Sequence, residues 1–207
     1  MPPWPKLSLF IIATLTLVFM PGPNTLYIIA RSIQQGRKAG IVSSLGVQFG
    51  SIFHIAAAAF GISALLISSP LAFSVVKYAG AIYLIYLGIK TLLTKEKSAG
   101  FKETKPARLK EVFYQGTIVQ LLNPKTALFF FAFLPQFIEP SRGAIALQII
   151  LLGAILMCLG TLSDVTYTMA SGSLANLMRG NLKFLQVQRY FAATVYLSLA
   201  LLTALSK

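Results

Sequence analysis

Two prolines interrupt a long apolar stretch near the start of the chain and limit what this stretch can fold into. Apolar sequence fills residues 7–19, meets the segment 20–25 (Met-Pro-Gly-Pro-Asn-Thr), and continues over residues 26–30. Pro21 and Pro23 each lack a backbone N–H, and each ring clashes with the preceding helical turn. The residue before each proline is also pushed away from helical geometry. An undistorted helix therefore cannot pass through this segment.

A break of this kind has a restricted set of environments in lipid. Broken backbone survives at membrane depth only where protein or a water-filled cavity satisfies the freed groups. A discontinuous helix at that depth is a pointer to a transport site. The alternative is a first helix that ends at Met20, followed by a surface loop over residues 21–25. Residues 7–20 are short against the roughly 20 residues that a span needs, which favours the broken span.

The composition identifies the class of protein. Of 207 residues, 56% are hydrophobic and 11% are charged, with a mean hydropathy of +0.75, whereas soluble domains carry about 25% charged residues. We therefore expect an all-α polytopic membrane protein in the bilayer. The net charge of +13 follows the positive-inside rule, because most basic residues lie between apolar runs, and nucleic acid is not expected as a partner. No small-x-small cleavage site follows the first apolar run, so we expect it to be retained.

The single cysteine excludes several kinds of site. Cys158 alone cannot form an intramolecular disulfide, a CxxC redox pair or a thiolate metal cluster. We expect it to be a packing residue, and we expect no metal and no cofactor.

The apolar runs predict six transmembrane helices. They cover residues 7–30, 40–68, 71–93, 112–138, 144–170 and 184–205. The fourth run is interrupted at residues 123–126 (Asn-Pro-Lys-Thr), and both interruptions contain Pro-x-Thr. Because three spans per half reverse the orientation of the second half, we predict two inverted three-helix repeats, each with its first helix broken at proline. The repeats are residues 1–93 and 112–207, joined by a basic cytoplasmic linker over residues 94–111.

The basic residues also predict the orientation. A first loop over residues 31–38, the linker 94–111 and the loop 171–183 hold nearly all of them. Basic loops stay in the cytoplasm. Both termini are therefore predicted on the outer side.

The second span carries an ordered row of small and polar residues. Gly46, Gly50 and His54 recur every four residues and therefore share one helix face. The two glycines form a small-xxx-small pair that lets another helix approach closely. Gln48 and Ser51 are the other polar residues deep in this span.

Taken together, these segments resemble the LysE family of amino-acid exporters. The resemblance rests on residues 21–24, the Gly46–Gln48–Gly50 stretch leading to His54, residues 77–88, residues 123–125, residues 134–137, and Asp164-x-x-Tyr167. It covers nearly the whole chain in the expected order and looks closest to the RhtB-like branch, which is associated with homoserine, threonine and other neutral amino acids. It implies a carrier in the bacterial inner membrane that expels amino acids or related small metabolites by proton antiport. It leaves open whether two copies pair as a homodimer.

An amino acid brings an ammonium and a carboxylate, and both need partners when they lose water. The half-helices beginning near Asn24 and Lys125 would offer free amide donors to the carboxylate. Lys125 could add its charge there, or its long stem could reach the membrane interface. The predicted substrate site comprises Pro21, Gly22, Pro23, Asn24, Thr25, Gln48, Asn123, Pro124, Lys125, Thr126, Asp164 and Tyr167.

Two residues are candidates for proton coupling. Asp164 is the only acidic residue inside a predicted span, and such a carboxylate costs roughly 2.5–3.5 kcal/mol to insert. It could pair with the substrate ammonium or carry the coupling proton, unless it lies at the cytoplasmic surface. His54 can exchange a proton near neutral pH, or it can be a neutral histidine satisfied by a neighbouring helix.

Three other functions compete with export by a secondary transporter. A membrane enzyme or redox carrier would need a nucleophile, thiol pair or metal set that the sequence does not supply, so we do not expect an enzyme. A non-transporting scaffold or assembly protein would need neither a cavity at the breaks nor Asp164. An exporter of a different solute, such as a metal ion, would want several intramembrane carboxylates, and only Asp164 is present.

Overall fold

The computed structural model describes residues 2–68, 70–93, 106–171 and the scattered positions 186–187, 190, 193–194, 197–198 and 200–201. The described part is helical throughout, as predicted. Most of the predicted linker 94–111 and of the sixth span 184–205 lies outside the described residues. The elements are α1 (Trp4–Val18), α2 (Pro23–Ser68), α3 (Pro70–Leu93), α4 (Leu109–Leu121), α5 (Pro124–Leu128), the π-helical turn η1 (Phe129–Phe133), the 3₁₀ turns η2 (Leu134–Phe137) and η3 (Pro140–Arg142), and α6 (Ile145–Met169).

A helix ends shortly before each of the two proline segments, and a new helix begins within it. α1 ends at Val18 and α2 begins at Pro23. α4 ends at Leu121 and α5 begins at Pro124. Proline suits the first position of a helix because that position has no helical acceptor for an N–H and because its fixed φ already matches the helix. Pro124 therefore both limits α4 and starts α5, whereas at the first break Pro21 limits α1 and Pro23 starts α2.

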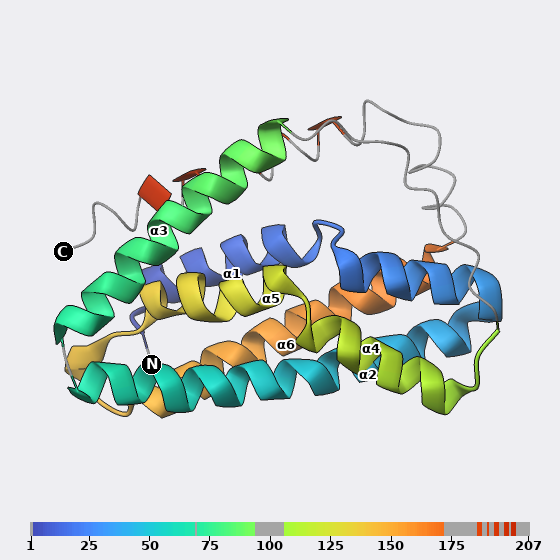
Figure 1. Ribbon diagram of the computed structural model, residues 1–207, viewed down its shortest axis with the longest axis horizontal. Coiled ribbons are helices and arrows are strands. Elements are labelled where there is room, and N and C mark those ends of the chain that lie inside the picture. The colour runs from blue at the N-terminus through green and yellow to red at the C-terminus, as the bar shows by residue number, and fades with distance from the viewer. Residues whose placement is uncertain are drawn as a thin grey trace.

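α2 turns back on itself at one residue. Gly36 has φ 81° and ψ 174°, which is non-helical, and glycine occupies this region at little steric cost. The first half of α2 continues past α1, and the second half returns along the molecule (Figure 1). The predicted loop over residues 31–38 is wrong, because the chain is helical up to Gln35 and again from Arg37. The predicted linker is also too long at its end, because residues 109–111 belong to α4.

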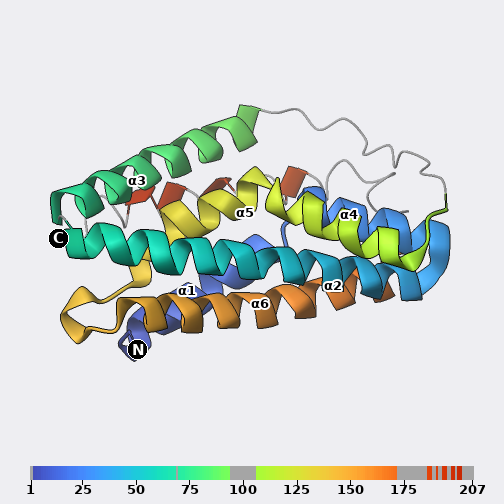
Figure 2. The same cartoon turned by 60° about the horizontal axis from the view of Figure 1, so that its bottom comes forward.

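The second half of α2 is the centre of the described fold. It runs between α6 and the α4–α5 pair (Figure 2). A Cβ atom added to Gly46 would overlap the carbonyl oxygen of Phe113, and one added to Gly50 would lie 2.9 Å from the carbonyl oxygen of Thr117. The predicted close approach at Gly46 and Gly50 is therefore confirmed, and the approaching helix is α4.

An aromatic cluster joins α1 to the turns that follow α5. The ring of Phe10 lies 6.1 Å from that of Phe133 and 5.1 Å from that of Phe137. All three side chains are buried. This cluster holds α1 against the second broken segment.

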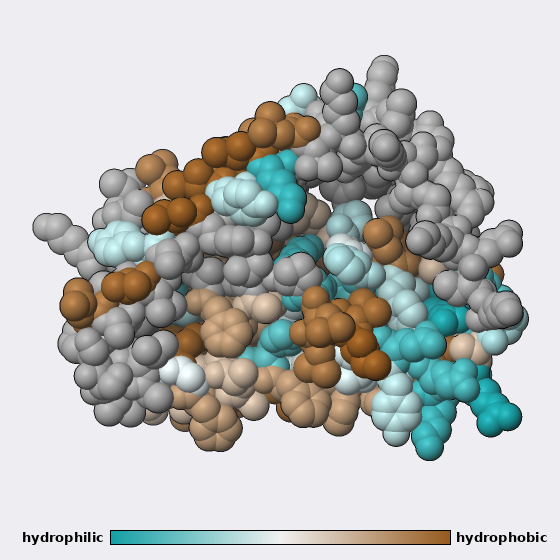
Figure 3. All heavy atoms as spheres, in the orientation of Figure 1, coloured by the Kyte–Doolittle hydropathy of each residue, from teal (hydrophilic) through white to brown (hydrophobic). Residues whose placement is uncertain are grey.

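Basic residues at the turn of α2 and at the start of α4 lie at one end of the described structure. The turn at Gly36 and the start of α4 lie together there (Figure 1), and Gln35 Nε2 donates to the carbonyl oxygen of Ala107 at 2.7 Å. Hydrophilic side chains concentrate on this end in the face shown in Figure 3. At the other end, Lys6 and Glu139 form an ion pair of 3.2 Å.

Among the described residues, two helices are long and apolar enough to cross a membrane, Pro23–Ile62 and Ile145–Met169. A third crossing follows if Leu109–Leu121 and Lys125–Phe137, which meet at 55°, are counted as one bent span. Trp4–Val18 is a shorter apolar helix. The predicted arrangement of six spans in two inverted repeats extends beyond the described residues.

Candidate functional site

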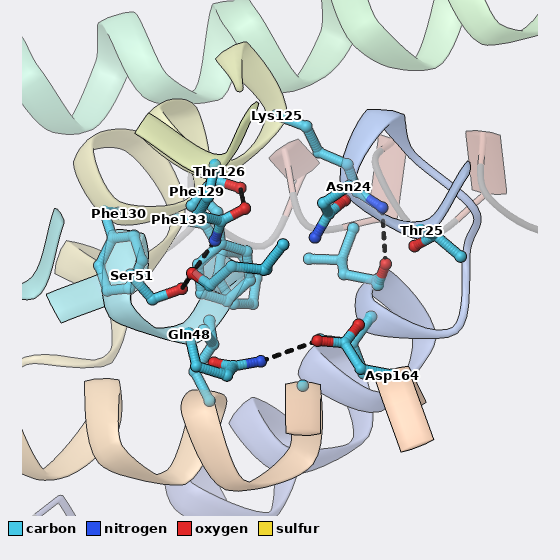
Figure 4. A pocket seen from close by; sticks show the side chains of 16 residues that line it. Asn24, Thr25, Gln48, Ser51, Lys125, Thr126, Phe129, Phe130, Phe133 and Asp164 are labelled. Atoms are coloured by element: carbon cyan, nitrogen blue, oxygen red, sulfur yellow. Dashed lines mark hydrogen bonds between the residues drawn. The ribbon is translucent and has the colours of Figure 1, made fainter. Parts of the chain in front are cut away.

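A cavity of about 80 Å³ lies where the two helix breaks meet, which is room for several water molecules. Side chains from both breaks, from the second half of α2 and from α6 surround it (Figure 4). Its wall is formed by Leu17, Val18, Asn24, Thr25, Val47, Gln48, Ser51, Gln120, Lys125, Thr126, Phe129, Phe130, Phe133, Leu156, Gly160 and Asp164.

Lys125 crosses from the second break to the first. Its Nζ donates to the carbonyl oxygens of Leu17, at 2.7 Å, and of Met20, at 2.8 Å. In a continuous helix the Leu17 carbonyl would accept from residue 21, but Pro21 has no N–H to give. The alternative in which Lys125 reaches the membrane interface is therefore wrong, because its ammonium lies at the end of α1.

α6 satisfies the remaining carbonyls at the end of α1. Ser163 Oγ donates to the carbonyl oxygen of Val18 at 2.9 Å. The Tyr167 hydroxyl donates to the carbonyl oxygen of Phe19, whose helical donor is missing because residue 23 is proline. Tyr167 thus supports the break from behind the cavity wall.

The second break is supported in the same way by a histidine. The carbonyl oxygen of Gln120 would accept from residue 124, and Pro124 again has no N–H. It accepts instead from the backbone N–H of Asn123 at 3.1 Å and from His54, whose Nε2 lies 3.1 Å away. Because a carbonyl oxygen only accepts, Nε2 must carry the hydrogen. The His54 ring also stacks on Phe130, with centroids 5.8 Å apart.

The asparagines of the two breaks lie next to each other. Asn123 Nδ2 donates to Asn24 Oδ1 at 3.4 Å. Asn123 Oδ1 accepts from the backbone N–H of Lys125 at 3.0 Å, which caps the start of α5. The first turn of α2, which contains Asn24 and Thr25, also presents backbone amides that no helix can satisfy from within.

A chain of polar side chains spans the second break. Thr126 Oγ1 donates to Gln120 Oε1 at 3.2 Å, and Gln120 Nε2 donates to Ser51 Oγ at 2.7 Å. Ser51 in turn donates to the carbonyl oxygen of Val47 at 3.3 Å. These bonds connect α5, α4 and α2 along one side of the cavity.

Asp164 is buried, with 4% of its surface exposed, and it lines the cavity. Ser44 Oγ and Gln48 Nε2 donate to its Oδ2 at 3.1 and 3.0 Å. The alternative that places Asp164 in solvent at the cytoplasmic surface is therefore wrong. Because these two donors converge on Oδ2, Oδ1 is the oxygen that the described residues leave for a ligand or a proton.

The rest of the wall is apolar. Phe129, Phe130 and Phe133 come from η1, Leu17 comes from α1, and Leu156 comes from α6. Lys125 and Asp164 lie on separate parts of the wall (Figure 4). The cavity thus offers a cation, a carboxylate and an apolar surface to the same small molecule.

The residues predicted for the site fall into three groups. Those on the cavity wall are Asn24, Thr25, Gln48, Lys125, Thr126 and Asp164. Tyr167, His54 and Asn123 bond to the helix breaks without belonging to the described wall. Pro21, Gly22, Pro23 and Pro124 form the breaks themselves.

Three features of the site are not predicted from the sequence. Ser44 precedes Gln48 by one turn on the same helix face, so it could have been found from Gln48. Gln120 precedes Pro124 by four residues, so its carbonyl could have been identified as lacking a donor. The aromatic run from Phe129 onward carried no such signal, since it looks like any apolar span.

Within the residues that the structure describes, no three His, Cys, Asp or Glu side chains come together as metal ligands would.

Comparisons with known proteins agree with a carrier. A family model described as LysE type translocator matches residues 15–206. The leucine efflux protein of Salmonella typhimurium (strain LT2) is 34% identical over 131 residues, which cover 63% of this chain and 62% of that protein. The uncharacterized membrane protein YrhP of Bacillus subtilis (strain 168) is 36% identical over 155 residues, 70% of this chain and 73% of that protein. No solved structure matches significantly.

Proposed function

Because this chain belongs to the LysE type translocator family, we propose that it is a secondary transporter that exports amino acids across the bacterial cytoplasmic membrane. A translocator family is one of carriers, which agrees with the expectation that the chain is not an enzyme. The observation that carries the proposal is the cavity in which both helix breaks meet Asp164 and Lys125.

The substrate would lie in this cavity as a zwitterion. Its ammonium would pair with Asp164 Oδ1, the oxygen left by Ser44 and Gln48. Its carboxylate would accept from the third proton of the Lys125 ammonium, since two are used on carbonyls. The first-turn amides of α2 would add donors, as half-helix N-termini do in other transporters.

The side chain of the substrate would lie against the apolar wall. Phe129, Phe130 and Phe133 form a surface for an aliphatic group, and the similar Salmonella protein is named for leucine efflux. A homoserine- or threonine-like substrate would instead direct its hydroxyl to Ser51, Gln120 or Thr126. We favour the aliphatic substrate because the aromatic wall is larger than the polar chain beside it.

We further propose six spans in two inverted repeats, with both termini on the periplasmic side. The clustering of the basic turn at Gly36 and the start of α4 at one end supports a cytoplasmic position for that end. Export would be driven by proton antiport, with Asp164 as the group that takes ammonium and proton in turn. The topology is tested by labelling single cysteines placed at the turn around Gly36 and in the linker 94–111, on a Cys158→Ser background.

The decisive experiment is efflux from proteoliposomes. Vesicles loaded with labelled leucine, threonine, homoserine or lysine are compared with protein-free vesicles, with and without a proton gradient. We expect faster, gradient-dependent loss of leucine and slower loss of lysine, because a second cation has no described partner in the apolar wall. Equal retention of all four by correctly inserted protein would leave the scaffold as the better interpretation.

A further inference from the structure

The end of α1 directs two carbonyl oxygens at one positive charge. Lys125 Nζ lies 2.7 Å from the Leu17 oxygen and 2.8 Å from the Met20 oxygen. The Leu17 carbonyl cannot accept from residue 21, which is proline, and besides Lys125 it accepts a backbone N–H from Met20 at 3.3 Å. Met20 itself lies inside the break. The C-terminal end of a helix also carries the negative pole of the helix dipole. The two oxygens and the dipole together favour a cation.

The neighbouring carbonyls differ in what they bind. Those of Val18 and Phe19 accept from the neutral hydroxyls of Ser163 and Tyr167. In the described residues around this break, the charged donor thus goes to the pair Leu17 and Met20. Half-helix C-terminal ends and unwound carbonyls form the coupling-ion sites of several transporters. In this protein the cation at the end of the broken helix is the ammonium of Lys125, which belongs to the chain itself.

We propose that the Leu17 and Met20 carbonyls form a monovalent-cation site that Lys125 fills from within the chain. The tethered ammonium takes the place of a free ion, so that the protein has no need of sodium or potassium there. When the lysine side chain is removed, the site accepts a small ammonium ion from solution. The consequence for transport rests on the proposed function, but the binding site itself does not.

The surroundings of Lys125 allow such a replacement. Its side chain passes Gly22, where an added Cβ would lie 3.4 Å from Lys125 Cδ and 3.7 Å from Nζ. Lys125 also lines the cavity. Shortening it to alanine therefore opens a path from the cavity to the two carbonyls. Propylammonium has the same atoms as the part of the side chain that is removed.

The test is the thermal unfolding of purified protein with added propylammonium at constant ionic strength. We expect it to stabilise Lys125→Ala, with the ratio of folded to unfolded protein rising about 11-fold at a concentration ten times its dissociation constant. The parent and the matched surface variant Lys110→Ala should not respond. An absent response in Lys125→Ala would overturn the proposal, and so would an equal response to uncharged 1-propanol.

Lys125→Ala could fail to fold in the absence of a ligand. Recovery of folded Lys125→Ala only when propylammonium is present during purification would support the site, and failure to recover it with or without propylammonium would overturn the site. A second variant provides an independent test. Lys125→Met fills the same path with an apolar chain and should be insensitive to propylammonium. A response as large as that of Lys125→Ala would contradict the site.

The consequence for coupling is tested on the parent protein. Efflux should proceed at the same rate in sodium, potassium and choline media at fixed pH, and a requirement for sodium or potassium would overturn the tethered-ion proposal. Should the protein export none of the amino acids offered, the unfolding experiment still decides whether the cation site exists. Failure of the site and failure of the proposed function are thus told apart.

Discussion

Replacing Asp164 by asparagine separates the effect of this carboxylate on the stability of the protein from its role in transport. The substitution keeps the size of the side chain, and its carbonyl oxygen can still accept from Ser44 and Gln48, which donate to Oδ2 at 3.1 and 3.0 Å. A carboxylate inside a span costs roughly 2.5–3.5 kcal/mol to insert. We therefore expect Asp164→Asn to be at least as stable as the parent while losing transport.

The expected loss of transport follows from the charge. A hydrogen bond to a charged group contributes about 1.5–3 kcal/mol, against about 1 kcal/mol for a neutral one. Replacing the charged bond by a neutral one should thus weaken substrate affinity about 2- to 30-fold, and losing the bond altogether should weaken it about 10- to 150-fold. Binding is measured by the protection of purified protein against thermal unfolding by leucine, and transport by efflux from proteoliposomes.

Two transport modes distinguish the roles of the carboxylate. If Asp164 binds the substrate ammonium, both leucine exchange and gradient-driven efflux fall in Asp164→Asn. If it carries only the coupling proton, exchange survives and gradient-driven efflux is lost. Glu139→Gln is the matched control, since Glu139 is a carboxylate at the surface that pairs with Lys6 at 3.2 Å. An asparagine variant with unchanged affinity and unchanged efflux would refute the role of Asp164.

Three further substitutions test the supports of the two breaks. His54→Asn keeps an N–H for the Gln120 carbonyl and should preserve the pH profile of efflux. His54→Leu should lower stability by about 0.6 kcal/mol, the average for such bonds in membranes, and by about 1.7 kcal/mol at most. Tyr167→Phe removes the donor to the Phe19 carbonyl and should lower the stability by a similar amount. Gly46→Leu should prevent α2 from approaching α4 and greatly reduce the yield of folded protein, measured by gel filtration in detergent.

The controls for these variants come from the same chain. Gly61→Ala adds a Cβ where nothing lies within 4 Å and should leave the yield unchanged. A changed pH profile of efflux in His54→Asn would instead indicate that His54 carries a proton. Full stability of Tyr167→Phe would mean that the Phe19 carbonyl finds another donor.

The parts of the structure that follow from backbone chemistry could be predicted. Proline has the same missing N–H in every context, so the breaks before Pro23 and Pro124 were visible in the sequence. The close approach at Gly46 and Gly50 was visible for the same kind of reason, since only the absence of a side chain permits it. The cavity residues adjoining the breaks, such as Asn24 and Lys125, were found through their position alone.

What the sequence could not supply was the identity of the partners. The rule that a proline at position i leaves the carbonyl at i−4 without a donor predicts that some group must reach Phe19 and Gln120. That the groups are Tyr167 and His54 depends on helix packing between distant segments. The length of the turn at Gly36 was overestimated, because polar and basic residues on both sides of it look like a loop. One glycine with positive φ is enough to reverse the chain.

The same carbonyl requirement connects the fold to the proposed transport cycle. Lys125, on the second broken helix, bonds to Leu17 and Met20 on the first, so a change of shape at one break would disturb bonds to the other. A substrate carboxylate that accepts the third proton of the Lys125 ammonium would share this cation with the two carbonyls. The substrate ammonium would meet Asp164 Oδ1, whereas Ser44 and Gln48 donate to Oδ2. Through its carboxylate, the bound amino acid would therefore act on the hydrogen bonds by which Lys125 connects the two breaks. In the proposed cycle, occupancy of the cavity would thus be coupled to the geometry of both broken helices.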